Sequence, residues 1–304
     1  MVLWPEPSIS VEVVTSLGIG VIDVRNLHFT YAHADRPAVR ELTFSVDRGE
    51  IFGFLGPSGA GKSTTQKVLV GLLEGYRGTV RVRDREVADW TGDDYERIGV
   101  SFESPNHFQK LTGLENLRYF AALYRGPTRS PDTLLEAVGL DSDRDRRVGE
   151  YSKGMKCRLS IARCLLNDPD LLFIDEPTGG LDPLNVRLVK DLIRSERSAG
   201  STVFLATHDM AAADELCDRV AFIVDGRIAC IDSPRALKLK HGERTVRVEY
   251  RSGDRMNQAD YPLEGLGDNA EFHHVLRDSD VQTIHTREAT LAEVFIRLTG
   301  RPLT

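Results

Sequence analysis

Apolar and polar residues alternate in two early segments of the chain, and a continuous apolar run follows them. The segments VIDVRNLHFTY, from Val21, and ELTFSVDRGE, from Glu41, alternate with a period of two, which predicts two antiparallel strands. IFGFLG, at residues 51–56, reads as a strand buried on both faces. A glycine-rich segment and a stretch of helical spacing come next. Strand, glycine loop and helix in this order predict the start of a parallel α/β unit.

Two later apolar runs, DLLFIDEP and STVFLATHD, also predict buried strands. A helix is expected between them, since Asp182 suits the N-cap and Pro183 suits the first helical position. Its apolar face comprises Leu184, Leu188, Leu192 and Ile193. The DG in AFIVDGRIACID predicts a hairpin.

The remaining patterns suggest how the chain is divided. Only helical patterns occur from about residue 104 to 167, which predicts a helical insertion into the α/β core. After Leu239 the pattern is more polar, RTVRVEY alternates, and Thr290 and Glu293 form a capping-box pattern before LAEVFIRLTG. We therefore expect an irregular extension over residues 1–20, an α/β domain over 21–237 and a small α+β domain over 238–304.

Composition narrows the class of protein. The 304 residues are 41% hydrophobic and 28% charged, and 46 acidic against 39 basic side chains give a net charge of −7. An acidic balance argues against nucleic acid as a main partner. No apolar run is long enough to cross a bilayer and no signal peptide is evident, so we expect a cytoplasmic protein. The cysteines have neither metal-ligand nor disulfide spacing, and we expect all to be reduced: Cys157, Cys164, Cys217 and Cys230.

A phosphate-binding motif lies between the first buried strand and the following helix. GPSGAGKST satisfies G-x-x-x-x-G-K-[ST], in which glycines let backbone N–H groups meet phosphates. In this motif Lys62 neutralises the β and γ oxygens and the Ser63 hydroxyl binds Mg²⁺. A simple glycine turn is the alternative, and the strand and helix on either side disfavour it. The predicted nucleotide-binding residues are Gly56, Pro57, Ser58, Gly59, Ala60, Gly61, Lys62, Ser63 and Thr64.

Two acids and a histidine end the later apolar runs. A carboxylate at a buried strand end is unfavourable unless it meets a cation, so we expect Asp175 to hold Mg²⁺. Glu176 is then placed to polarise an attacking water. His208 ends the next run, where ligands bind in open α/β sheets, so we expect it near a γ-phosphate. Capping or ion-paired acids and a structural histidine are the alternatives.

A second anion site is predicted at YSKGM, residues 151–155. A Ser-x-Gly turn at the start of a helix presents unpaired N–H groups and the positive end of the helix dipole. The motif GPSGAGKST already provides a better phosphate site, so the sequence leaves open which anion the turn at residues 151–155 binds.

Together these segments resemble the ATP-binding subunit of an ABC transporter, from about Val21 to Ile231, with YSKGM in place of the signature LSGGQ. The resemblance implies an α/β P-loop NTPase core with a mixed sheet, an antiparallel β subdomain and a helical insertion, followed by the α+β appendage. It also implies that two subunits pack head to tail around ATP. Ser152 and the N–H of Gly154 would then hold the γ-phosphate of a nucleotide bound mainly by another chain.

The resemblance carries further residues over by position. Tyr31 matches the aromatic residue that stacks on adenine, and Asp182 lies in the loop that crosses the dimer interface. Glu103 stands where the family usually has a glutamine that reaches Mg²⁺ and the attacking water, so we expect function with an altered metal preference. Lys153 and Met155 replace Gly and Gln of the signature, a form that resembles the branch of drug and ion exporters.

The leading hypothesis is an ATPase that dimerises on ATP and drives transport, as export of a drug, lipid or ion, through a separate membrane permease. Its cofactors are ATP and Mg²⁺. Its partners are a second copy or a related ATPase subunit and the permease, at the inner face of the cell membrane. The catalytic residues are Glu176 as base, His208, Lys62 and Glu103. A soluble ABC ATPase acting on ribosomes or DNA, and an ATP-binding switch without catalysis, are the alternatives.

Overall fold

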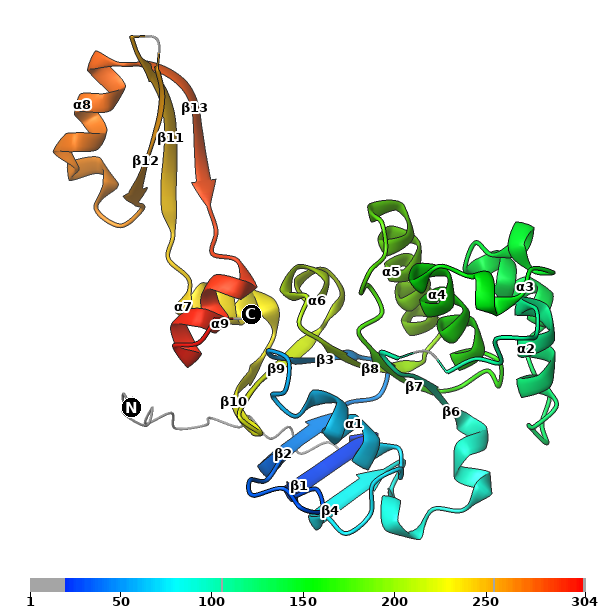
Figure 1. The fold of residues 1–304 in the computed structure, drawn as a ribbon. Coiled ribbons are helices and arrows are strands. Elements are labelled where there is room, and N and C mark those ends of the chain that lie inside the picture. The colour runs from blue at the N-terminus through cyan, green and yellow to red at the C-terminus, as the bar shows by residue number, and fades with distance from the viewer. Residues whose placement is uncertain (1–19, 105, 254, 303–304) are drawn as a thin grey trace. The chain divides into compact units, whose positions relative to one another are not determined.

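The computed structural model describes residues 20–302 except 105 and 254, so the predicted N-terminal extension, apart from Gly20, lies outside the described residues. The chain divides into two compact units, one up to Ser233 and one over Pro234–Arg301 (Figure 1).

Two sheets and two groups of helices form the first unit. Its strands are β1 (Ile22–Phe29), β2 (Val39–Val46), β3 (Ile51–Leu55), β4 (Arg77–Val82), β5 (Arg85–Glu86), β6 (Ile98–Ser101), β7 (Leu171–Asp175), β8 (Thr202–Thr207), β9 (Arg219–Val224) and β10 (Arg227–Asp232). Its α-helices are α1 (Lys62–Leu69), α2 (Gly113–Ala121), α3 (Pro131–Ala137), α4 (Lys153–Cys164), α5 (Pro183–Ser198) and α6 (Met210–Leu216). Short 3₁₀ turns are η1 (Val87–Asp89), η2 (Gly92–Arg97), η3 (Asp141–Asp143) and η4 (Val148–Glu150).

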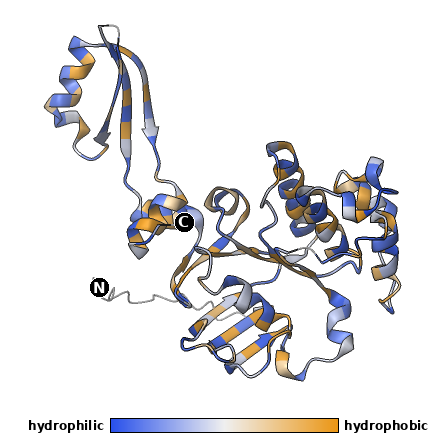
Figure 2. Ribbon diagram, viewed as in Figure 1, coloured by the Kyte–Doolittle hydropathy of each residue, from blue (hydrophilic) through white to orange (hydrophobic). Residues whose placement is uncertain are grey.

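An antiparallel sheet has the strand order β2-β1-β4-β5. The predicted pairing of the first two strands is confirmed, with Ile22 opposite Val46. Apolar and polar residues alternate along β1, β2 and β4, as the orange and blue bands in Figure 2 show. Strand β4 was not predicted from the sequence, because Val80 and Val82 are its only buried positions.

A six-stranded mixed sheet has the order β10-β9-β3-β8-β7-β6. Strands β6, β7, β8, β3 and β9 pair in parallel, and only the β9–β10 hairpin is antiparallel. The hairpin turns at Asp225 and Gly226, both with positive φ, as the Asp-Gly sequence predicted. Every residue of β3, β7 and β8 is buried, which explains their continuous apolar sequences.

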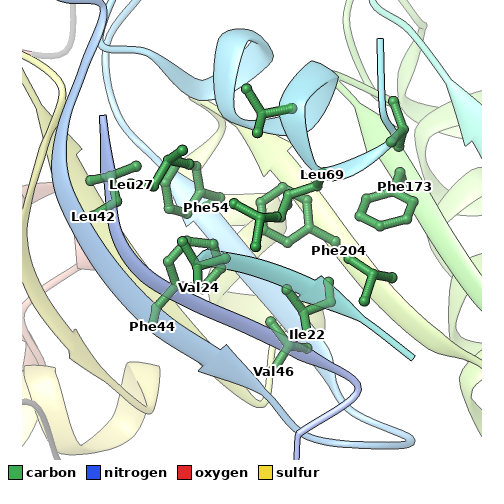
Figure 3. Packing of buried hydrophobic residues seen from close by; sticks show 14 of the residues in the cluster. Ile22, Val24, Leu27, Leu42, Phe44, Val46, Phe54, Leu69, Phe173 and Phe204 are labelled. Atoms are coloured by element: carbon green, nitrogen blue, oxygen red, sulfur yellow. The ribbon is translucent and has the colours of Figure 1, made fainter. Parts of the chain in front are cut away.

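One hydrophobic core joins the two sheets (Figure 3). Phe44 of the antiparallel sheet lies 5.5 Å from Phe54 of β3, and Phe54 lies 5.4 Å from Phe204 of β8, measured between ring centroids. Such packing of large rings fixes the relative height of the strands that contribute them. The loops that follow β3, β7 and β8 are therefore held at one edge of the mixed sheet.

Helices occupy the segment between β6 and β7, as the sequence predicts. The helices α2, α3 and α4, drawn in green in Figure 1, pack on one another, and no strand occurs among the described residues of this segment. Thr112 and Glu115 form a capping box at the start of α2, and Ser152 caps α4. Local caps thus define where two of these helices begin.

The second unit is a small α+β fold. Its elements are α7 (Pro234–His241), β11 (Thr245–Ser252), β12 (Arg255–Pro262), η5 (Leu266–Asp268), α8 (Ala270–Asp278), β13 (Asp280–Arg287) and α9 (Leu291–Thr299). The sheet order is β12-β11-β13, with all neighbours antiparallel. Helix α7 contacts α9 and belongs to this unit, whereas the predicted domain boundary at residue 237 falls inside α7. The predicted capping box of Thr290 and Glu293 begins α9.

Candidate functional site

The candidate site lies where three parallel strands end. Leu55 of β3 is opposite Thr207 of β8, and Asp175 of β7 is opposite Ala206 of β8. The carboxyl ends of parallel strands share one edge of a sheet, and this edge is the usual position of ligands in open α/β folds. The phosphate motif, the two acids and His208 therefore converge from separate segments.

Residues 56–61 form the loop between β3 and α1. A Cβ at Gly56 would lie 2.2 Å from the carbonyl oxygen of Ile223, so no larger side chain fits there. Gly61 has φ of +108° and is the N-cap of α1, a conformation that favours glycine. The first turn of α1 contains no acidic residue. The loop and helix start thus present backbone N–H groups and a positive dipole end, as an anion requires.

Lys62 is held over this loop in a buried position. Its Nζ donates hydrogen bonds to the carbonyl oxygens of Gly56, at 2.8 Å, and Pro57, at 3.1 Å. The same nitrogen lies 3.7 Å from Oε1 of Glu176. The ammonium therefore stands between the loop and the acid, where it can neutralise phosphate oxygens.

Asp175 is buried at the end of β7 with an unsatisfied oxygen. Its Oδ1 has no hydrogen-bond partner among the described residues, while the Ser63 hydroxyl bonds to the carboxylate. Burial raises the pKa of Asp175 to about 6; the Ser63 bond opposes this rise, and the nearby charges of Glu176 and Glu103 add to it. A divalent cation would supply the missing partner of Oδ1 and offset the negative charge.

Glu176 is fixed by its backbone and by three contacts. Its φ of 49° places a non-glycine residue in the left-handed region, a strain that is often found at functional sites. Thr207 Oγ1 donates to Oε2 at 2.7 Å, and the His208 N–H donates to Oε1 at 3.0 Å. His208 Nδ1 also lies 2.7 Å from Oε1. The carboxylate is thus buried and oriented at the strand edge, beside Lys62.

Thr207 is a site residue that the sequence pattern did not predict. The signal was present, since Thr207 is a polar residue at the end of an otherwise apolar run. It bonds Glu176 through its side chain, and its Oγ1 also accepts from the N–H of Asp209.

Tyr31 follows β1 and lies beside the start of α1. Its hydroxyl is 3.2 Å from Oγ1 of Thr64, and its ring packs edge-on against Phe29. The side chain is 40% exposed, so one part of the ring is open to a planar group next to the phosphate loop.

Ser152 is the N-cap of α4, and Gly154 lies in the first turn of this helix. Ser152 Oγ accepts from the N–H of Met155 at 3.2 Å, and no hydrogen bond in the described part of the chain joins residues 152–154 to residues 56–64. A Cβ at Gly154 would lie 3.0 Å from Leu181 Cδ2. Asp182 caps α5 by accepting from Leu184 and Asn185, as predicted.

Glu103 follows β6 and is exposed. Its charge acts on Asp175, since it is one of the causes that raise the pKa of that acid. Within residues 20–302, apart from the two undescribed positions, Glu103 forms no ion pair. It is therefore a further carboxylate whose charge reaches Asp175.

Two structural features bear on the expectations about cysteines and membranes. None of the four cysteines forms a disulfide bond: Cys157, Cys164, Cys217 and Cys230. In the part of the chain that the structure describes, no helix has the length and apolar character needed to span a bilayer.

Comparison with known families gives two matches. Residues 39–179 match the family model described as ABC transporter. Residues 244–288 match the model described as fluoroquinolone efflux ABC transporter C-terminal domain.

Similar proteins match nearly the whole chain. The fluoroquinolones export ATP-binding protein of Mycobacterium tuberculosis strain H37Rv is 60% identical over 289 residues, covering 95% of this chain and 96% of the relative. The Nod factor export ATP-binding protein I of Bradyrhizobium diazoefficiens is 35% identical and covers 95% and 98% of the two chains.

Solved structures match part of the chain. A dimeric ATP-binding cassette in a post-hydrolysis state with ADP and Pi has a TM-score of 0.64 and 25% identity, covering 70% of this chain and 98% of that one. An ATP-binding subunit of an ABC transporter has a TM-score of 0.64 and 30% identity, covering 72% and 92%.

Proposed function

The chain belongs to the ATP-binding proteins of ABC transporters, and from that membership we propose that it hydrolyses ATP at the described site to drive export through a separate membrane protein. The observation that carries the proposal is the buried Glu176, which Thr207 and His208 orient beside Lys62. This arrangement joins a base, a polarising partner and a cation at the mouth of a phosphate-binding loop.

Binding of the nucleotide uses the loop and the residues on either side of it. The triphosphate accepts from backbone N–H groups of residues 56–61 and from the N-terminus of α1. Lys62 Nζ exchanges its contacts with the carbonyls of Gly56 and Pro57 for the β and γ oxygens. Tyr31 stacks on the adenine, since its half-exposed ring lies beside Thr64 at the end of the phosphate loop.

We infer that Mg²⁺ accompanies the nucleotide. Ser63 and Asp175 would hold it, because Oδ1 of Asp175 is buried without a partner and a hard oxygen-lined site suits this ion. When bound, Mg²⁺ offsets negative charge on the phosphate oxygens.

Hydrolysis needs a water aligned with the γ-phosphate. Glu176 accepts a proton from that water as it attacks, and Thr207 and the His208 N–H keep the carboxylate oriented. We propose that the His208 side chain, whose Nδ1 lies next to Oε1, donates to the γ-phosphate through its other ring nitrogen. Lys62 stabilises the charge that develops on the transferred group.

The start of α4 acts on a nucleotide bound by another copy. Among the described residues no hydrogen bond joins Ser152 or Gly154 to the phosphate loop of their own chain, and a related cassette was solved as a dimer with ADP and Pi. We propose that two copies pack head to tail, so that Ser152 and the Gly154 N–H bind the γ-phosphate held by the partner. Asp182 lies in the same interface. Loss of the γ-phosphate then lets the dimer open.

An exposed aromatic cluster in the helical segment supports a membrane partner. Phe108 packs edge-on against Tyr119 at 4.8 Å, and both rings are partly exposed, as is Leu123. Exposed apolar groups of this kind mark interaction surfaces. The cluster follows the loop of Glu103, so a permease bound there would sense the nucleotide site. We propose on this basis that the chain works at the inner face of the membrane.

Fluoroquinolone-like drugs are the cargo class that we propose. The support is the 60% identity over 95% of the chain to a protein named for fluoroquinolone export, together with the matching C-terminal family model.

Phosphate release by the purified chain with Mg²⁺ and ATP tests the catalytic part of the proposal. Turnover that disappears in Glu176→Gln while ATP binding persists supports it. ATP binding without turnover by the unmodified chain would instead favour a nucleotide-dependent switch. Reconstitution with the permease in vesicles, with norfloxacin as the probe, tests the export and the cargo.

A further inference from the structure

Strand β6 lies at one edge of the mixed sheet and leads to Glu103. Among the described residues β6 pairs with β7 alone, and Ser101, its last residue, lies opposite Ile174. Asp175 directly follows Ile174, and Glu103 follows Ser101 after one residue. The position of the end of β6 therefore decides how close the exposed carboxylate of Glu103 comes to the buried carboxylate of Asp175.

Two buried amide side chains hold β6, one at each end of the strand. At its start, Asn167 Nδ2 donates to the carbonyl oxygens of Ile98, at 2.9 Å, and Glu96, at 3.0 Å. At its end, Gln66 Nε2 donates to the carbonyl oxygen of Ser101 at 3.3 Å. An edge strand has backbone groups without a partner in the sheet, and these bonds satisfy some of them.

A role in folding does not by itself explain Gln66. Its side chain is fully buried on α1 and forms a single hydrogen bond, and in the described part of the chain its Oε1 has no partner. A buried amide with an unpaired oxygen is unfavourable, whereas an apolar side chain of similar size has no such cost. The amide therefore needs an explanation beyond packing.

Helix α1 connects the Gln66 bond to the phosphate loop. The helix starts at Lys62, directly after the loop, and Gln66 lies about one turn further along it. The Ser63 hydroxyl, in the first turn of the same helix, bonds the carboxylate of Asp175. Gln66 thus joins the helix that carries Ser63 to the strand that leads to Glu103.

We propose that Gln66 is a positioning residue for the proposed Mg²⁺ site: its amide holds the end of β6 against α1, so that the charge of Glu103 acts on a cation bound at Asp175. The inference rests on the proposed cation site and adds to it a residue that acts only through β6. The charge of Glu103 reaches Asp175 in the structure. A shift of this carboxylate away from the site weakens its attraction for a divalent cation, because the interaction between charges falls with distance.

The test measures the Mg²⁺ concentration that half-saturates the stabilisation of the full chain by ADP, in thermal melts at pH 8. Gln66→Met keeps the length of the side chain and removes the amide, and it should raise this concentration about fivefold. Without nucleotide and Mg²⁺, the melting temperature should stay within about 3 °C of wild type, because the unpaired oxygen is removed together with the bond. Glu103→Gln should raise the Mg²⁺ concentration by a similar factor, and the double variant should exceed it by less than about twofold.

Asn167→Ala is the matched control, because it removes the buried amide at the other end of β6. It should lower the melting temperature and leave the half-saturating Mg²⁺ concentration within about twofold of wild type. Three results would overturn the role of Gln66: an unchanged Mg²⁺ concentration in Gln66→Met, an equal rise in Asn167→Ala, or a double variant in which the two rises multiply. If ADP stabilises the wild-type chain equally with and without Mg²⁺, the proposed cation site itself is wrong.

Discussion

Thr207 Oγ1 donates a hydrogen bond of 2.7 Å to Oε2 of Glu176, and both residues are buried at the edge of the mixed sheet. The other carboxylate oxygen, Oε1, accepts a hydrogen bond from the backbone N–H of His208. Each oxygen of the proposed base thus has its own donor, and the rotation of the carboxylate is fixed. A base that is held in one orientation needs little reorganisation when water is bound.

Thr207→Val should lower the turnover of ATP by about 10–100-fold, with little change in ATP affinity, because Glu176 loses the donor that fixes its orientation. Thr207→Ser keeps the hydroxyl and should recover most of the turnover. The measurement is steady-state phosphate release across ATP concentrations. Equal turnover in the valine and serine variants would argue against an orienting role.

Glu176→Gln should lower turnover by roughly 10²–10⁴-fold, the span expected when a general base is lost. The amide keeps the size of the side chain, so ATP binding should remain. Phosphate release and equilibrium binding of ATP, measured on the same preparation, separate the two effects. Near-normal phosphate release from this variant would remove Glu176 from the mechanism.

Magnesium dependence should change with pH around the pKa of Asp175, which burial raises to about 6. Above this pH the carboxylate is charged and ready for the cation, whereas below it protons compete with the cation. The half-saturating Mg²⁺ concentration for nucleotide-dependent stabilisation should therefore rise about tenfold per pH unit below 6 and stay level from pH 7 to 8. Thermal melts with ADP at varied Mg²⁺ measure it, and a constant half-saturation from pH 5 to 8 would exclude Asp175 as the ligand.

His107 should make stability depend on pH. Its Nε2 lies 3.0 Å from Ser160 Oγ and from the carbonyl oxygen of Lys156, and burial lowers its pKa to about 4. The unfolded chain, with a histidine pKa near 6.5, binds the proton more readily, so this stability is present above about 6.5 and is lost as pH falls towards 4. The full effect is roughly 3 kcal/mol.

Urea unfolding at pH 7 and pH 5 measures this effect. The wild-type chain should lose more stability between these pH values than His107→Gln, which has no titrating ring. Because His107 connects the loop after Glu103 to α4, the variant should also be less stable than wild type at pH 7, by about 1–3 kcal/mol for a lost buried hydrogen bond. Identical pH dependence of the two chains would show that His107 titrates outside this range.

The second unit should depend on packing between its two flanking helices. Phe295 of α9 is fully buried, whereas the adjacent Ile296 is 47% exposed. Phe295→Ala should destabilise this unit by about 3–5 kcal/mol, through lost burial and the cavity that remains. Ile296→Ala is the matched control and should cost less than about 1 kcal/mol. Limited proteolysis and differential scanning calorimetry of the full chain compare the two variants.

Much of the first unit follows from local sequence signals. The strands with continuous apolar runs, the hairpin at Asp225 and the cap at Asp182 occur where they were predicted. Their contacts join residues close in sequence, such as Asp182 with Leu184 and Asn185, so they are encoded locally. Elements with a weak apolar pattern were missed or left undefined, among them β4, β12, β13 and α8. Tertiary packing stabilises these elements, and their own sequences carry no strong periodic signal.

The candidate site likewise combines features encoded by local sequence with features that depend on tertiary packing. The residue types and the phosphate motif could be recognised from the sequence, because the loop and its helix are one continuous segment. The partners of the catalytic residues could not be recognised in that way. Thr207 meets Glu176 across 31 residues and His107 meets Ser160 across 53, contacts that exist only once the sheet and helices have packed.

The sequence by itself thus determined which groups are available for chemistry, since a motif, a cap or a buried strand depends on neighbours within a few residues. Only the tertiary structure decided which carboxylate of the site is oriented by hydrogen bonds and which one keeps a buried oxygen without a partner. Those properties depend on burial and on groups distant in sequence, and the packed core between the two sheets is what brings them together.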